Sequence, residues 1–201
     1  MDEFEKKYWR QQLEVLGIDE AGRGALCGPL VVCGVSFPRG YFHAEINDSK
    51  KLEAGKRKCL FKEIIASARE YHIKIVKRET IDALNVYRAT QQAMQEIAER
   101  FSGFILTDCM PLAACDFASL VKGDSRSISI AAASILAKVI RDHIMQGYHL
   151  LYPAYGYDQH KGYATKHHLE MIEKHGIINI YRRSFEPVKT WLKPNLFDEI
   201  V

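Results

Sequence analysis

The chain has no long hydrophobic run. Among its 201 residues the longest apolar stretches are 26–35 and 128–137, which are too short or too interrupted to span a membrane. The first seven residues, Met-Asp-Glu-Phe-Glu-Lys-Lys, are charged and lack the apolar segment of a secretory signal. We therefore expect a cytoplasmic protein with no membrane partner.

Cysteine spacing of the kind that binds zinc is also missing. The five cysteines (27, 33, 59, 109 and 115) form no CxxC pair, so we expect reduced, mostly buried thiols. His160 and the pair His167-His168 lack HExxH spacing, and a structural or surface role is expected for them. No GxxxxGK[ST] phosphate loop is present, which disfavours a nucleotide-driven motor.

The composition is that of one compact domain. Hydrophobic residues make up 47% of the chain and charged residues 26%, with no repeats and no long Gly/Ser linker. The net charge of +3 is weak evidence for a nucleic-acid partner. The segment 160–193 is better evidence, because it carries seven Lys or Arg against three Glu. A solvated basic tail would explain the same segment equally well.

Hydrophobic periodicity predicts strands mixed with helices. Strands are expected over 13–20, 29–37, 71–77 and 103–107, and helices over 54–69, 89–100, 127–147 and 165–175. This order of elements indicates an α/β layer fold with a mixed sheet.

Two adjacent carboxylates end the first predicted strand. Asp19 and Glu20 follow an apolar run, and Gly22-Arg23-Gly24 comes directly after them. Carboxylate oxygens suit divalent cations, and an arginine between glycines suits phosphate. Because successive strand side chains point to opposite faces, both carboxylates reach one ion only if the strand ends or bulges here. Alone, the pair would be a solvated turn; with the glycines it favours metal-assisted phosphoryl transfer.

A second strand end supplies another carboxylate. Asp108 ends the last predicted strand, and active sites of α/β sheets lie beyond the carboxyl ends of strands. The candidates for a fourth carboxylate are Asp116, Asp124 and Asp142. Asp142 would lie ~21 Å along the helix from its start and is more simply a partner of Lys138. Asp124 lies before the helix N-terminus, where negative charge is tolerated.

Four carboxylates around one point repel one another by roughly 4 kcal/mol per pair at an effective dielectric near 20. Such a cluster would not stay ionised without cations. The sequence therefore predicts a site for Mg²⁺ or Mn²⁺ if these side chains converge.

The motifs in this order resemble those of bacterial ribonuclease HII, a type 2 ribonuclease H. The resemblance runs from about Leu16 to Val188 and rests on these segments: Gly-Ile-Asp-Glu-Ala-Gly-Arg-Gly (17–24), Asp-Ser-Lys-Lys-Leu (48–52), the run from Lys-Gly-Asp-Ser to Ile-Arg-Asp (122–142), Tyr-Pro-Ala-Tyr-Gly-Tyr (152–157), Gln-His-Lys-Gly-Tyr-Ala-Thr (159–165) and Tyr-Arg-Arg-Ser-Phe-Glu-Pro-Val (181–188).

The resemblance implies an RNase H-like mixed sheet flanked by helices, with a small C-terminal helical segment. We divide the chain accordingly into a catalytic core, residues 1–147, and a substrate-binding helical segment with a tail, residues 148–201. The implied activity is endonucleolytic. The enzyme would hydrolyse the RNA strand of RNA–DNA hybrids and nick duplex DNA 5′ to embedded ribonucleotides in ribonucleotide excision repair. Two-metal catalysis with Mn²⁺ or Mg²⁺ would leave 5′-phosphate and 3′-hydroxyl ends, and the protein would act as a monomer.

The family's functional residues can be placed on this sequence by its motifs. Its four metal-binding, catalytic carboxylates fall on Asp19, Glu20, Asp108 and Asp124. The residues that sense the 2′-hydroxyl and grip the flanking phosphate fall on Gly22, Arg23 and Gly24, and the tyrosine that reads the junction falls on Tyr163. Separately, four basic residues are expected phosphate contacts, although each could equally be solvated: Lys50, Lys51, Arg182 and Arg183.

The sequence departs from the family at a few positions. Ala25 stands where proline is usual, Cys27 where a small alanine is frequent, and Cys109 where a glycine follows the third carboxylate. If that glycine permits a special backbone angle, Cys109 would shift Asp108 slightly.

Two other functions fit parts of the pattern. Ribonuclease HIII would carry a long N-terminal binding domain, whereas about 16 residues precede the first motif here. A hybrid-binding module without activity would not need four carboxylates, which repel the phosphates of the substrate.

Overall fold

The computed structural model describes residues 2–113 and 115–193. Its core is a five-stranded sheet in the order β3-β2-β1-β4-β5. The strands are β1 (Val15–Ala21), β2 (Leu30–Ser36), β3 (Glu70–Val76), β4 (Phe104–Asp108) and β5 (Phe117–Leu120). Strands β1, β4 and β5 run parallel, and β2 is antiparallel to both β1 and β3. The carboxyl ends of β1, β4 and β5 therefore meet at one edge of the sheet.

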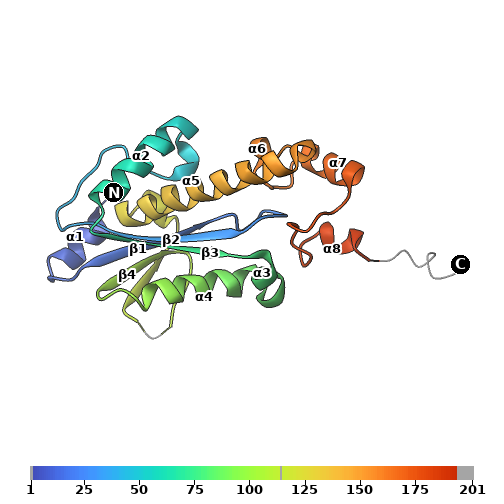
Figure 1. The fold of residues 1–201 in the computed structure, drawn as a ribbon. Coiled ribbons are helices and arrows are strands. Elements are labelled where there is room, and N and C mark those ends of the chain that lie inside the picture. Colours follow the sequence, from blue (N-terminus) through green and yellow to red (C-terminus); the bar gives the residue numbers. More distant parts are fainter. Residues whose placement is uncertain (1, 114, 194–201) are drawn as a thin grey trace, which may run out of the picture.

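Helices cover both faces of the sheet (Figure 1). Helix α5 (Ile128–Leu151) and helix α2 (Ala54–Ser67) lie on one face, and α3 (Arg78–Leu84) and α4 (Val86–Ala98) lie on the other. Alternation along β1 decides which face each side chain joins, since Leu16 and Ile18 pack with α4 while Ala21 packs with α5. Asp19 therefore belongs to the α5 face and Glu20 to the α4 face.

Helix α5 approaches β1 closely because Gly17 has no side chain. A Cβ at Gly17 would lie 2.2 Å from the backbone nitrogen of Ile130, so no larger residue fits. The small residues of the first turns, Ala131, Ala132 and Ala133, are fully buried against the sheet. This contact brings the N-terminus of α5 to the edge where β1 and β4 end.

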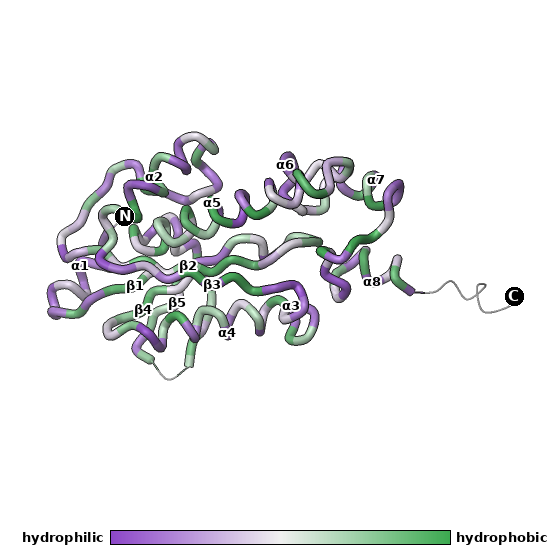
Figure 2. The backbone as a smooth tube through the Cα atoms, in the orientation of Figure 1, coloured by the Kyte–Doolittle hydropathy of each residue, from purple (hydrophilic) through white to green (hydrophobic). Residues whose placement is uncertain are grey.

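Helix α1 (Glu3–Trp9) lies at the edge of the sheet and is largely hydrophilic, in contrast to strand β2 (Figure 2). Its Glu5 is fully buried, and one carboxylate oxygen accepts bonds from the Ser127 hydroxyl and the backbone N–H of Ser129. Glu5 thereby satisfies donors at the start of α5. The sequence analysis predicted neither this helix nor this contact.

Three short helices and a 3₁₀ turn extend beyond the sheet: η3 (Pro153–Tyr155), α6 (Tyr157–His160), α7 (Lys166–His175) and α8 (Val188–Trp191). Their apolar side chains share a core with Leu26, Cys27 and Met145. Two further 3₁₀ turns, η1 (Ser49–Lys51) and η2 (Gly123–Ser125), lie against α5. Helix α5 crosses residue 147, the expected boundary between core and C-terminal segment, without interruption. Residues 194–201 of that segment lie outside the described residues.

Most predicted elements are confirmed within a few residues, and the expectation for the cysteines is wrong in part. Helix α4 begins at Val86, three residues before the predicted start at 89. The cysteines are free, as expected, but they are not mostly buried: Cys27 and Cys33 are buried, whereas Cys59 and Cys109 are exposed. Strand β5 and helix α3 were not predicted.

Candidate functional site

Three aspartates from separate elements converge at the carboxyl edge of the sheet. Asp19 lies near the end of β1, Asp108 is the last residue of β4, and Asp124 lies in η2 just before α5. One carboxylate oxygen from each lies within 4.8 Å of the others. The strand ends and the close approach of α5 at Gly17 together produce this arrangement.

Hydrogen bonds fix the aspartates in place. Asp19 Oδ1 accepts the backbone N–H of Glu20 at 2.7 Å, and Asp108 Oδ1 accepts the N–H of Gly123 at 2.7 Å. The second bond ties β4 to the turn that carries Asp124. Because backbone groups orient these carboxylates, their positions are set before any ligand arrives.

The site is strongly acidic, and its electrostatics show this. Burial, together with repulsion by Glu20 and Asp108, raises the pKa of Asp19 well above its usual value. Burial also raises the pKa of Asp124, with further repulsion from Asp48 and Asp108. Asp48, which enters the sequence prediction only as the first residue of the motif 48–52, places another negative charge beside Asp124.

Glu20 lies on the other face of β1 and is not one of the three carboxylates that converge within 4.8 Å, although its charge acts on Asp19. Its Oε1 lies 3.7 Å from Arg23 Nη1, while its Oε2 is buried without a hydrogen-bond partner. Burial raises the pKa of Glu20, an effect that Arg23 opposes and Asp108 reinforces. Asp19 lies two residues and Glu20 one residue before the strand end at Ala21, so the expected strand end at residue 20 is confirmed to within a residue. The strand pairs regularly with β2 through both positions, so these two side chains point to opposite faces.

The donor set fits a hard divalent cation. Three carboxylate oxygens within 4.8 Å repel one another by roughly 3 kcal/mol per pair at an effective dielectric near 20, and a cation removes this cost. The unpartnered Oε2 of Glu20 is a further free acceptor of the kind that a cation satisfies. Lys50 Nζ lies 3.6 Å from Asp124 Oδ2 on an exposed side chain, a distance at which it only partly neutralises the cluster.

The other candidates for a fourth carboxylate lie elsewhere. Asp142 is bound by Lys138 at 2.7 Å, as its sequence spacing suggested. Asp116 is exposed and precedes β5, and its carbonyl accepts the N–H of Ile105, so it lies at the opposite end of the parallel strands.

The glycine-rich loop after β1 is held by a buried arginine that the sequence analysis overlooked. Arg141 of α5 is fully buried and donates to the carbonyls of Pro29, Lys161 and Cys27 at 3.0, 2.9 and 3.2 Å. Gly22 has φ of +94°, and a Cβ there would lie 1.9 Å from Arg141 Nε. Only glycine fits at this position.

The basic residues expected to contact phosphate fall into two groups. Lys50, Lys51 and Arg183 are exposed, but Arg182 is fully buried. Arg182 donates to the carbonyls of Gly28 and Arg23 at 3.2 and 3.0 Å. This position disagrees with direct phosphate contact, because the guanidinium faces the loop and not solvent. Its visible effect is to hold the backbone of Gly22-Arg23-Gly24.

Tyr163 lies beside the glycine-rich loop. The loop residue Leu26 donates its N–H to the Gly162 carbonyl at 2.9 Å, and the Arg141 guanidinium lies 5.3 Å from the Tyr163 ring. Tyr163 is half-buried and so keeps an accessible face. The loop expected to sense a ribose and the tyrosine expected to read a junction are thus physically connected.

Two histidines support the Tyr163 loop from behind. The rings of His160 and His168 stack at 4.0 Å, and both side chains are buried. His168 Nδ1 bonds the Tyr163 carbonyl at 2.9 Å, and His160 Nδ1 accepts the N–H of Gly162 at 3.1 Å. The structural role predicted for these two histidines is confirmed.

Cys109 adopts the backbone angle that a glycine would favour. Its φ is +51°, in the left-handed region that is costly for residues with a side chain. The special angle suspected from the sequence therefore exists, and this chain places a cysteine in it directly after Asp108.

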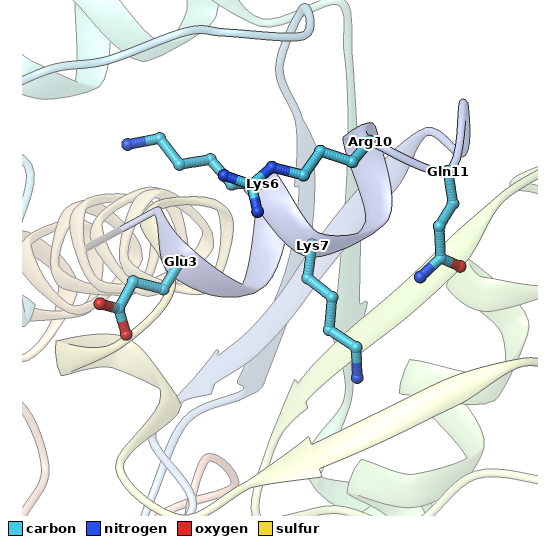
Figure 3. Close-up of a pocket in the computed structure, with 5 residues that line it drawn as sticks. All are labelled: Glu3, Lys6, Lys7, Arg10 and Gln11. Carbon is cyan, nitrogen blue, oxygen red and sulfur yellow. The ribbon is translucent and has the colours of Figure 1, made fainter.

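A hollow of about 570 Å³ lies on the surface of α1, apart from the carboxylate site. It is lined by residues of α1 and of the turn that follows it: Glu3, Lys6, Lys7, Arg10 and Gln11 (Figure 3). These side chains extend from a single surface segment, and none of the convergent carboxylates takes part.

An RNase H-like sheet with carboxylates gathered at its edge defines a class, the metal-dependent nucleases of this fold. The ribonuclease HII family model matches residues 16–188. Among curated relatives, ribonuclease HII of Bacillus anthracis is 46% identical over 183 residues, covering 89% of this chain and 71% of its own length. Ribonuclease HII of Acholeplasma laidlawii is 43% identical over 194 residues, covering 94% and 96%.

Solved structures agree with this. Ribonuclease H2 from Pyrococcus horikoshii OT3 superposes with a TM-score of 0.72 at 25% identity, covering 89% of this chain and 96% of its own. A ribonuclease HIII solved in complex with Mn²⁺ shows the same fold, with a TM-score of 0.63 at 17% identity over 88% of this chain and 68% of its own. The chain belongs to the ribonuclease HII family. It is a ribonuclease H, a metal-dependent nuclease whose family hydrolyses the RNA strand of RNA–DNA hybrids.

None of the helices among the described residues is long and apolar enough to cross a membrane.

Proposed function

We propose that this ribonuclease also nicks duplex DNA on the 5′ side of a single embedded ribonucleotide, leaving a 5′-phosphate and a 3′-hydroxyl. The proposal rests on two neighbouring features. The three aspartates bring carboxylate oxygens within 4.8 Å of one another, and the glycine-rich loop that follows β1 is hydrogen-bonded to the segment that carries Tyr163. One part suits phosphodiester hydrolysis, and the other suits reading a sugar. The enzyme would act as a monomer in the cytoplasm, in ribonucleotide excision repair.

Asp19, Glu20, Asp108 and Asp124 would hold two divalent cations, Mn²⁺ or Mg²⁺. When bound, such ions supply charge neutralisation at the phosphate and activation of a water. The chain's own contribution is to fix the carboxylates through the backbone N–H groups of Glu20 and Gly123.

The 2′-hydroxyl is the group that marks a ribonucleotide inside DNA. We assign its recognition to the backbone of Gly22-Arg23-Gly24 and to the Tyr163 hydroxyl. Gly24 is exposed with open space around it, so its backbone groups are accessible to a sugar, whereas Gly22 is buried against Arg141 and shapes the turn through its positive φ. Arg141 and Arg182 hold this backbone from the interior by their bonds to loop carbonyls.

The phosphates flanking the cut would be contacted by exposed cations. Arg23, Lys50 and Lys51 lie on the two segments nearest the carboxylates, and Arg183 lies on the segment that follows Arg182. The Arg183 backbone is held by Asp82, which accepts its N–H at 3.0 Å.

The test uses three duplexes of the same sequence: DNA with one ribonucleotide, all-DNA, and an RNA–DNA hybrid. Each is incubated with Mg²⁺ or Mn²⁺, and cut positions are mapped on sequencing gels. We expect cutting at the 5′ side of the single ribonucleotide, cutting of the hybrid, and no cutting of the all-DNA duplex. Cutting of the hybrid alone would leave the family assignment intact but overturn recognition of single ribonucleotides.

A further inference from the structure

A groove away from the carboxylate site lies between helices α2 and α5 and reaches the edge strand β3. It consists of two adjoining hollows of about 760 and 360 Å³, which share Ile75 of β3 and Ile144 of α5. Helix α5 packs on β1 and β2 and continues past the end of the sheet toward α7 (Figure 1). We call this feature the α5–β3 groove. None of the four carboxylates lines it.

The floor of the α5–β3 groove is apolar. Phe61, Val139, Ile140 and Ile144 line the larger hollow and are only partly buried against the core. Ile75 is 49% exposed.

The apolar surface continues along the edge strand. Ile73 and Tyr71 are exposed and lie on the same face of β3 as Ile75, by strand alternation. A contiguous exposed apolar surface of this kind indicates an interaction site.

The rim of the groove is basic. Five basic side chains line the larger hollow: Arg57, Lys58, Lys62, Lys138 and Lys161. Among the lining residues in the described part of the chain, Asp142 is the one carboxylate. Lys138 already binds Asp142 at 2.7 Å. Lys58 and Lys62 are exposed and form no ion pair within residues 2–113 and 115–193. They are therefore available to an acidic ligand.

We propose that the α5–β3 groove docks an acidic segment of a partner protein that carries aliphatic or aromatic side chains. Acidic groups of that segment would meet Lys58 and Lys62, and its apolar side chains would cover Ile75 and Ile144. A nucleic-acid backbone matches the rim but not the floor, because phosphates gain nothing from covering isoleucines. The groove thus differs from the substrate-facing surface, where polar and basic groups surround the carboxylates.

The experiment measures fluorescence anisotropy of a short labelled peptide, in which Asp and Glu alternate with Leu and Phe, against the full-length protein. A second peptide replaces Leu and Phe by Ser, and a labelled DNA duplex is the third probe. We compare the wild type with Lys58→Glu/Lys62→Glu and with Ile75→Ser. Matched controls are Arg100→Glu, an exposed charge reversal in the turn after α4, and Leu150→Ser, an apolar residue that is 82% exposed outside the groove.

We expect saturable binding of the first peptide, weakened about tenfold by each groove variant and unchanged by either control. Cleavage of a hybrid should stay at the wild-type rate in the groove variants. The proposal is overturned if the first peptide does not bind saturably, or if the serine peptide binds as well as the first. It is also overturned if the double charge reversal weakens duplex binding and leaves peptide binding unchanged, which would make the groove a nucleic-acid surface.

Discussion

Replacing Arg141 should disconnect the two loops that we assign to ribose recognition. Its guanidinium is fully buried and joins three backbone carbonyls, those of Pro29, Lys161 and Cys27, at 2.9 to 3.2 Å. Each bond from a charged donor contributes about 1.5–3 kcal/mol. Removing the buried charge returns several kcal/mol of desolvation cost. We therefore expect Arg141→Met to lower the free energy of unfolding by about 3 kcal/mol, measured by urea denaturation.

Activity should fall further than stability alone explains. At temperatures where the variant is folded, the Tyr163 loop would no longer be fixed against the glycine-rich loop. A displacement of about 1 Å at a reacting group costs on the order of 10²-fold in rate. We expect a loss of that size on the single-ribonucleotide duplex, with Arg100→Met, an exposed position in the turn after α4, as the control. An Arg141→Met protein with wild-type stability and wild-type junction cutting would refute the proposed role of Arg141.

Three further predictions concern the site and its support. Asp108→Asn should abolish cleavage. Binding of the hybrid in gel-shift titrations should stay equal or tighten, because a charge that repels the phosphates is lost. Residual cutting together with lost binding would contradict the assignment. Tyr163→Phe should reduce junction cutting less than Tyr163→Ala, since stacking of the ring is worth ~1–3 kcal/mol; equal losses would remove the ring from recognition. Burial lowers the pKa of His168 to about 4. Between pH 6.5 and 4 this imidazole is therefore protonated in the unfolded chain but neutral in the folded protein, which favours unfolding. Stability should therefore fall by up to about 3 kcal/mol across this window. The loss should be smaller in His168→Gln when urea midpoints are compared, and an identical loss in both proteins would exclude this titration as its source.

The site could be predicted from sequence where its signals are local. Asp19, Glu20 and Asp108 each follow an apolar run, and hydrophobic runs mark strands whatever the tertiary contacts. Asp124 could be separated from Asp142 by helix geometry alone, and the observed bond between Lys138 and Asp142 agrees with that reasoning. The helix start signal at Ser127 is equally local, since its side chain accepts the N–H of Ile130.

Contacts between distant segments could not be predicted in this way. Arg141 looks like an ordinary polar position on α5, but its partners Cys27 and Pro29 are more than a hundred residues away in sequence. The burial of Arg182 follows from its contacts with the carbonyls of Gly28 and Arg23, which no periodicity encodes. Strand β5 is only four residues long and only partly buried, so its hydrophobic signal is weak.

The central claim is that the carboxylate cluster promotes direct attack of water on the phosphodiester, with the 2′-hydroxyl recognised and not reacting. The most direct test is mass spectrometry of the ends produced from a duplex with one ribonucleotide. We predict a 5′-phosphate on the ribonucleotide and a 3′-hydroxyl on the upstream DNA, with no product from Asp108→Asn. A 2′,3′-cyclic phosphate end would mean that the ribose attacks its own phosphate, and it would contradict the proposed hydrolysis.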